Sequence, residues 1–104
     1  MTMSPMEMFF NEAPEVAKAF QNLITAVASS PGLDGKTKQL IYIAMKAASG
    51  DAGAVRAHIP MAKQMGATKE EVVDAVLMSL TVSGIRGVIT CLPEVIQCYS
   101  DSSE

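Results

Sequence analysis

The chain of 104 residues contains no tryptophan, one histidine and two cysteines, and only 5% of its residues are aromatic. One histidine and two cysteines cannot supply the four ligands of a structural zinc site, so we expect no metal and no other cofactor. Cys91 and Cys98 lie seven residues apart in a segment with a helical pattern. That spacing separates them by about 10 Å along a helix axis, beyond the reach of a disulfide, and we expect two thiols, both buried.

Strongly basic segments and long apolar runs are also missing. The net charge is −3 and the eight lysines and arginines are dispersed, which argues against a nucleic-acid partner. The longest apolar segment, 72–82, is interrupted by Asp74, Ser79 and Thr81 and falls short of the ~18 residues of a membrane span. Because no basic segment precedes an apolar one near the N-terminus, no signal peptide is expected. We therefore expect a cytoplasmic protein without membrane contact.

The length predicts a single domain over residues 1–104. With 49% apolar residues, such a domain cannot hide all of its apolar side chains. Exposed stripes on 72–80 and 88–95, together with an arm carrying four methionines in the first eight residues, are therefore expected to pack on other copies of the chain in a closed homo-oligomer.

Signals for helices recur along the chain, whereas the alternation typical of strands is absent. Ser4-Pro5-Met6-Glu7 and Thr68-Lys69-Glu70-Glu71 are capping boxes, and Asp34 and Asp51 are placed to cap two further helices. Pro60 is expected to bend the fourth helix within one turn of the histidine, and residues 101–104 are expected to fray. The predicted fold is all-α, with six helices over about 4–10, 11–29, 36–49, 51–66, 68–80 and 88–99.

The segment SGDAGAVRAHIP, residues 49–60, contains the single histidine, His58. A histidine in a site can act as a general acid or base, but one that only bonds a backbone group is also common. Asp51 is explained more simply as a helix cap, and Arg56 points to a different side of a regular helix from His58. Gln39 can donate and accept hydrogen bonds, either to a ligand or to a neighbouring helix.

Several of these residues carry a resemblance to a known family. LDGKTKQLI at 33–41, Ile-Ala-Met at 43–45, Arg56-x-His58, and Ala62, Gly66, Thr68, Glu70 and Glu71 together resemble the carboxymuconolactone decarboxylase family, which includes the alkylhydroperoxidase D branch. The resemblance covers about residues 20–96. It implies a compact orthogonal helical bundle that assembles as trimers or hexamers, with a small-molecule pocket near His58 at a subunit boundary.

The peroxidase branch of that family carries a Glu, a Cys-x-x-Cys pair and a His, and the matching positions here are Gln39, Asp51, Ala54 and His58. Neither Asp nor Ala can replace a thiolate, and a neutral glutamine cannot relay a proton as a carboxylate does. The decarboxylase branch also lacks these cysteines and keeps Ile-Ala-Met and Arg-x-His, so it is the nearer match.

Three functions follow from the residues and the resemblance. The favoured one is a lyase-like enzyme in which His58 is catalytic and Gln39, Arg56 and Asp51 bind a small carboxylated or lactone-like substrate. The second is an oligomeric binding or assembly protein that has lost the chemistry. The third, a peroxiredoxin-type antioxidant activity, requires Cys91 or Cys98 to lie within reach of His58.

Overall fold

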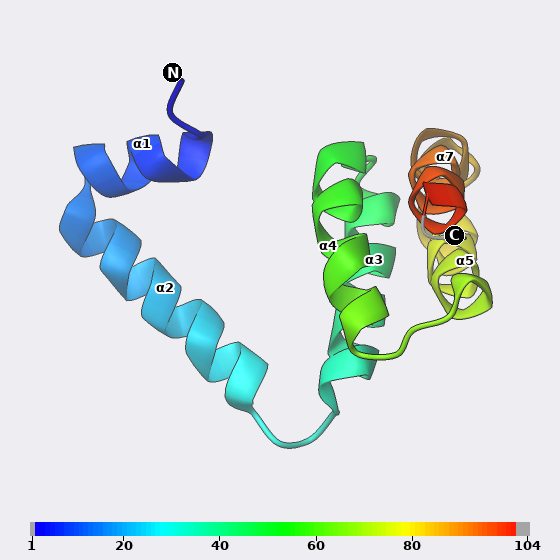
Figure 1. Ribbon diagram of the computed structural model, residues 1–104, viewed down its shortest axis with the longest axis horizontal. Helices are drawn as coiled ribbons and strands as arrows, with labels where there is room; N and C mark the ends of the chain where they lie inside the picture. The colour runs from blue at the N-terminus through cyan, green and yellow to red at the C-terminus, as the bar shows by residue number, and fades with distance from the viewer. Residues whose placement is uncertain (1, 102–104) are drawn as a thin grey trace. The chain divides into compact units, whose positions relative to one another are not determined.

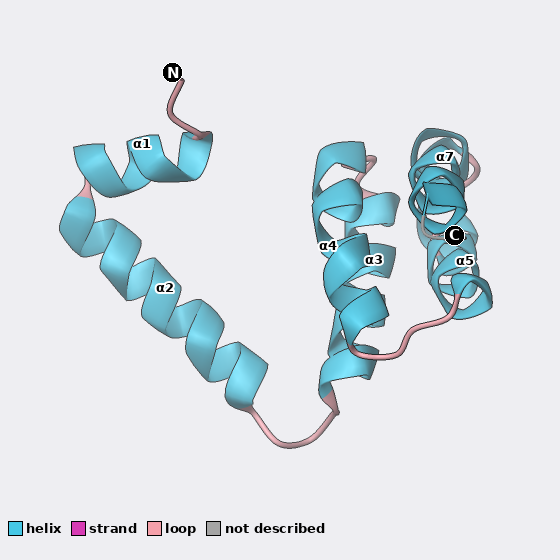
Figure 2. Cartoon of the chain, viewed as in Figure 1, coloured by secondary structure: helices cyan, strands magenta, loops and turns pink. Residues whose placement is uncertain are grey.

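The computed structural model describes residues 2–101, and within that range the chain forms helices and turns but no strand (Figure 2). The predicted all-α fold is confirmed. The helices, labelled in Figure 1, are α1 (Pro5–Glu12), α2 (Pro14–Ser29), α3 (Gly35–Ala48), α4 (Ala52–Gln64), α5 (Lys69–Met78), α6 (Leu80–Ser83) and α7 (Arg86–Asp101). Over this range no helix is both long enough and apolar enough to cross a membrane.

The six predicted helices correspond to α1 to α5 and α7, and the short α6 is an addition. The fifth helix ends at Met78 rather than near Leu80, where the Ser79 hydroxyl donates to the Val76 carbonyl oxygen at 2.7 Å and competes with the helical pattern. Gly84, with φ of 76°, separates α6 from α7, which begins two residues earlier than predicted. Both α4 and α7 continue through their internal prolines. Of the tail that was expected to fray, 102–104 lie outside the described residues.

The helix caps match the sequence signals closely. The Ser4 hydroxyl oxygen accepts the Glu7 backbone N–H at 3.1 Å while the Glu7 carboxylate accepts the Ser4 N–H at 2.7 Å. Thr68 and Glu71 form the same reciprocal pair at the start of α5. Asp34 caps α3 by accepting the Thr37 N–H at 2.8 Å. These caps satisfy backbone donors that have no partner inside the helix.

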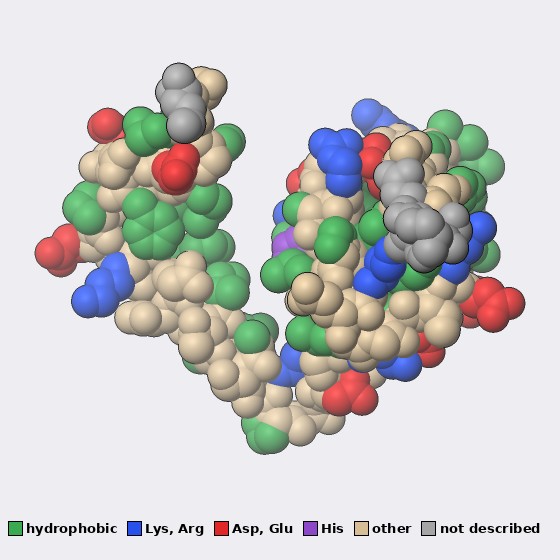
Figure 3. All heavy atoms as spheres, in the orientation of Figure 1, with side chains coloured by type: hydrophobic (Ala, Val, Ile, Leu, Met, Phe, Trp, Pro, Cys, Tyr) green, Lys and Arg blue, Asp and Glu red, His purple; other side chains and the backbone are tan. Residues whose placement is uncertain are grey.

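The chain divides into two compact units, one up to Gly32 and one from Leu33 onward, and each is described by itself. In the first unit, α1 packs on α2 through Phe9, whose ring centre lies 6.1 Å from that of Phe20. Ala17 is the single fully buried side chain among the described residues of this unit. One side of α2 is therefore apolar and exposed (Figure 3), with Val16, Phe20, Leu23, Ile24 and Val27.

The second unit has its core between α3, α4, α5 and α7. Its fully buried side chains come from every one of these helices, and they include Ile43, Val55, Ile59, Val72, Val76, Cys91 and Val95. The prediction that both stripes form an interface is wrong in part, because Val72, Val76, Val88 and Val95 are buried in this core. A helix turns one face inward every 3.6 residues, so only the other face of each predicted stripe is exposed, at Leu77, Met78, Leu80 and Ile89.

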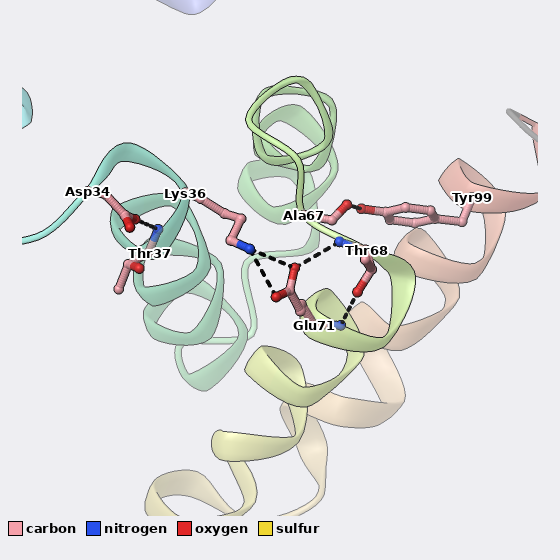
Figure 4. A network of polar contacts seen from close by, with 7 residues as sticks. All are labelled: Asp34, Lys36, Thr37, Ala67, Thr68, Glu71 and Tyr99. Atoms are coloured by element: carbon pink, nitrogen blue, oxygen red, sulfur yellow. Dashed lines mark hydrogen bonds and ion pairs between the residues drawn. The ribbon is translucent and has the colours of Figure 1, made fainter.

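Polar contacts link α3 to the start of α5, and α7 to the turn before α5 (Figure 4). The Lys36 ammonium contacts both carboxylate oxygens of Glu71, at 3.0 and 3.3 Å. The pKa of Glu71 is lowered first by the Thr68 backbone hydrogen bond and then by Lys36. The Tyr99 hydroxyl donates to the Ala67 carbonyl oxygen at 2.7 Å, which ties α7 to the turn before α5.

Helix α7 lies close to the backbone of α3 at Gly87. A Cβ atom at this position would overlap the Ala47 carbonyl group and would come within 3.2 Å of the Ser79 hydroxyl oxygen. The contacted group is backbone in the middle of the core, so it cannot move aside as a flexible side chain can. A residue without a side chain is therefore required here.

Replacing Gly87 with Ala should lower the free energy of unfolding by about 1–3 kcal/mol through overpacking. Gly53→Ala is the matched control, because a Cβ at Gly53 meets nothing closer than 3.7 Å and alanine favours a helix over glycine by up to about 1 kcal/mol. Urea unfolding measures both. Equal stability of the two variants would contradict the close approach.

Candidate functional site

The site is built on the reversal between α3 and α4. Gly50 lies in the left-handed region, with φ of 76°. Its backbone N–H donates to the Ala47 carbonyl oxygen, and the backbone N–H of Asp51 donates to the Lys46 carbonyl oxygen at 2.9 Å. This pair of bonds closes a helix that ends in glycine. The Asp51 carboxylate then accepts the Ala54 N–H at 3.0 Å and opens α4. The two helices consequently run side by side in opposite directions (Figure 1).

This pairing brings His58 of α4 against Gln39 of α3. The His58 Nδ1 lies 3.0 Å from the Gln39 side-chain oxygen Oε1, and the His58 ring stacks on Tyr42 with ring centres 3.9 Å apart and an angle of 28° between the planes. His58 is half-buried beside the fully buried Ile59. Tyr42 was not predicted as part of the site, although its spacing of three residues from Gln39 places both on one side of a helix.

The contact with Gln39 decides which nitrogen of His58 carries the proton. With the Gln39 carboxamide oxygen placed toward the ring, this contact is satisfied when Nδ1 donates, and the neutral ring then carries its proton on Nδ1. The other nitrogen, Nε2, then has a free electron pair, and no residue within 2–101 forms a hydrogen bond to it. His58 is thus arranged as a base whose acceptor nitrogen is Nε2.

The surroundings of His58 favour its neutral form. Burial lowers its pKa below the ordinary value of 6.5, and the positive charge of Lys46 adds to the effect. The Lys46 Nζ atom lies 5.7 Å from the centre of the Tyr42 ring and 3.8 Å from an oxygen of Asp51. At neutral pH, His58 is therefore uncharged.

Arg56 and Asp51, the other predicted binding residues, have structural partners of their own. The Arg56 guanidinium lies 3.2 Å from the Glu94 carboxylate of α7. Two residues along a helix point to different sides, which agrees with this separation of Arg56 from His58. Asp51 caps α4 and faces Lys46. The structure thus brings Gln39 to His58 through a direct contact, whereas Arg56 is turned toward α7.

The two cysteines are both free, as predicted. Cys91 is fully buried, and its pKa is raised first by burial and then by the negative charges of Asp51 and Glu94. Cys98 is half-buried rather than buried. A thiol with a raised pKa is a poor nucleophile. Residues 2–101 hold no cluster of three or more His, Cys, Asp or Glu side chains that could bind a metal ion.

An apolar groove of about 450 Å³ lies on the opposite side of α3 from Gln39, between α3 and α5. Its lining residues are Thr37, Leu40, Ile41, Ala44, Glu71, Asp74, Ala75, Leu77 and Met78. A smaller hollow of about 290 Å³ shares Ala44 and Met78 with it and extends to α6. The groove is therefore separate from the His58 site.

Comparison with known proteins finds similarity over most of the chain. The model of the carboxymuconolactone decarboxylase family matches residues 14–94, from the start of α2 into α7. An uncharacterized protein of Methanocaldococcus jannaschii is 29% identical over 96 residues, which cover 92% of this chain and 90% of that protein.

The pKa of His58 should lie below 6.5, and its proton NMR signal can be followed without assignment because the chain has one histidine. As the pH falls below 6.5, the unfolded chain binds the proton before the folded chain does. The contribution of His58 to stability is therefore complete above pH 6.5 and is lost as the pH falls through the folded pKa. The urea-unfolded chain is the control, and a midpoint for the folded protein at or above that of the unfolded chain would contradict the burial of the ring.

Proposed function

Since the chain belongs to the carboxymuconolactone decarboxylase family, we propose that it is a lyase-like enzyme in which His58 transfers a proton on a small carboxylated or lactone-like compound. The observation that carries this proposal is the contact between His58 Nδ1 and Gln39, because it leaves Nε2 as the reactive nitrogen. That His58 is half-buried rather than fully buried supports access of a ligand to it.

The proposed reaction uses the lowered pKa of His58. An anionic substrate raises the pKa of a neighbouring histidine, so His58 takes up a proton from solvent at Nε2 when the substrate binds. The bond to the departing carboxylate then breaks, CO₂ leaves, and the electron pair stays on the substrate carbon. That carbon receives the proton from Nε2, which returns His58 to its neutral form.

Gln39 is the positioning residue in this proposal. A carboxylate at this place would stabilise the protonated imidazole ring by an opposite charge, whereas the neutral amide holds the ring without adding a charge. The protonated ring is thus a stronger acid beside Gln39 than beside a glutamate. This difference favours delivery of the proton to carbon.

A second candidate is a binding or assembly protein without catalytic activity. The apolar groove between α3 and α5 supports it, because its volume falls in the range of small-molecule pockets and it lies away from His58. The peroxidase alternative has less support, since the raised pKa of Cys91 disfavours a reactive thiolate.

Replacement of His58 with Gln should lower the release of CO₂ from carboxymuconolactone by roughly 100-fold or more, in line with the contribution of general acid–base catalysis. Lys63→Gln is the control, because it also introduces a glutamine into α4 but at a side chain that contacts Tyr99, with Nζ 4.7 Å from the centre of that ring. Circular dichroism establishes whether both variants fold. Undiminished CO₂ release by folded His58→Gln would refute the role of His58, and a folded wild-type protein that releases none would favour the binding protein.

We further propose that the chain forms a cytoplasmic homo-oligomer, a trimer or a hexamer, with the site near a subunit boundary. The exposed face of α2 supports self-association. Val16, Phe20, Leu23 and Val27 are spaced four, three and four residues apart, as in the apolar seam between packed helices. We call these four residues the α2 seam, and the occupant we propose for it is a second copy of the chain.

Sedimentation at micromolar concentration should therefore show a trimer or hexamer for the wild type. Leu23→Glu should give smaller species, because it places a charge in the α2 seam. Thr25→Glu is the matched control, since Thr25 is exposed on the other side of the same helix. A monomeric wild type, or equal effects of both substitutions, would contradict the proposed interface.

A further inference from the structure

One side of α3 carries three polar side chains near His58. Gln39, Tyr42 and Lys46 are three and four residues apart, so their side chains follow one another on the same side of the helix. Gln39 bonds the His58 ring, Tyr42 stacks on it, and Lys46 carries a positive charge beside Tyr42. The ring centres of His58 and Tyr42 lie 3.9 Å apart and the Lys46 Nζ atom lies 5.7 Å from the Tyr42 ring centre, so the ammonium group is within about 10 Å of the His58 ring centre. A base and a cation thus lie within the reach of one small molecule.

We propose that Lys46, rather than Arg56, binds a carboxylate of the compound on which His58 acts. This inference rests on the proposed function and names the residue that would recognise the anion. Lys46 was not among the predicted site residues, because a single lysine in a helix carries no sequence signal of its own.

Lys46 is available for a ligand. Its side chain is 38% exposed, and its distance of 3.8 Å from Asp51 is too long for a hydrogen bond. The other oxygen of Asp51 already accepts the Ala54 N–H. An ion pair between exposed groups at this distance is weak, so the flexible lysine side chain can turn from Asp51 to a bound carboxylate at little cost.

Arg56 is less suitable than Lys46, both because of its existing partner and because of its direction. Its guanidinium contacts Glu94 at 3.2 Å, and Glu94 is only 22% exposed. Withdrawing Arg56 would leave a largely covered carboxylate without its partner, which is costly. Arg56 also points away from His58, as its contact with α7 shows.

The chemistry indicates which carboxylate Lys46 would bind. A cation held on the departing carboxylate stabilises the ground state and opposes the loss of CO₂. Lys46 should therefore bind a carboxylate that stays on the compound, while the carbon that receives the proton lies near His58 Nε2.

The test is a titration of the protein with glutarate, a dicarboxylate that cannot react, observed through the His58 NMR signal. In the wild type, glutarate should raise the pKa of His58, and potassium chloride at equal ionic strength should not. Lys46→Gln should weaken glutarate binding roughly tenfold or more, as expected for loss of a charged hydrogen-bond partner. Lys46→Arg should keep most of the binding.

Arg56→Gln and Lys63→Gln are the comparison variants, and both should bind glutarate as the wild type does. Unweakened binding by Lys46→Gln, or loss of binding in Arg56→Gln, would overturn the assignment. A wild type whose His58 signal does not respond to glutarate would overturn it as well. These outcomes are distinct from failure of the proposed function, which is decided by CO₂ release in the His58→Gln variant.

Discussion

The reversal of the chain at Gly50 and Asp51 is the constraint on which the candidate site depends. Gly50 adopts a backbone conformation that side chains disfavour, and Asp51 both completes the end of α3 and caps the start of α4. With so short a connection, α4 must return along α3. Gln39 and His58, nineteen residues apart in the chain, consequently meet at 3.0 Å. The site is thus a product of helix-end geometry before any ligand is considered.

Features that depend on near neighbours in the chain could be predicted from the sequence. The caps at Ser4, Asp34 and Thr68 and the order of the six longer helices were predicted correctly, because each follows from a few adjacent residues. The contributions of Tyr42 and Lys46 could not be predicted, since they arise only when α3 packs on α4. The ion pair of Arg56 with α7 likewise requires the folded unit.

Membership of the family describes the scaffold more completely than it describes the chemistry, because function depends on the particular residues of a site. By the resemblance drawn from the sequence, Gln39 stands where the peroxidase branch carries a glutamate, and Asp51 and Ala54 stand where it carries two cysteines. Asp51 has become part of the helix reversal, whereas Gln39 remains in contact with His58. His58 is therefore in contact with an uncharged group, and its pKa is lowered by burial and by Lys46.

In the proposed site, Gln39 keeps the proton of neutral His58 on Nδ1 and leaves Nε2 free to react. A long-range nitrogen–proton NMR spectrum of the imidazole ring at pH 8 distinguishes the two nitrogens directly. The structure predicts a protonated Nδ1 and an unprotonated Nε2 in the wild type, with this preference lost in Gln39→Leu. A wild-type ring that carries its proton on Nε2 would contradict the account.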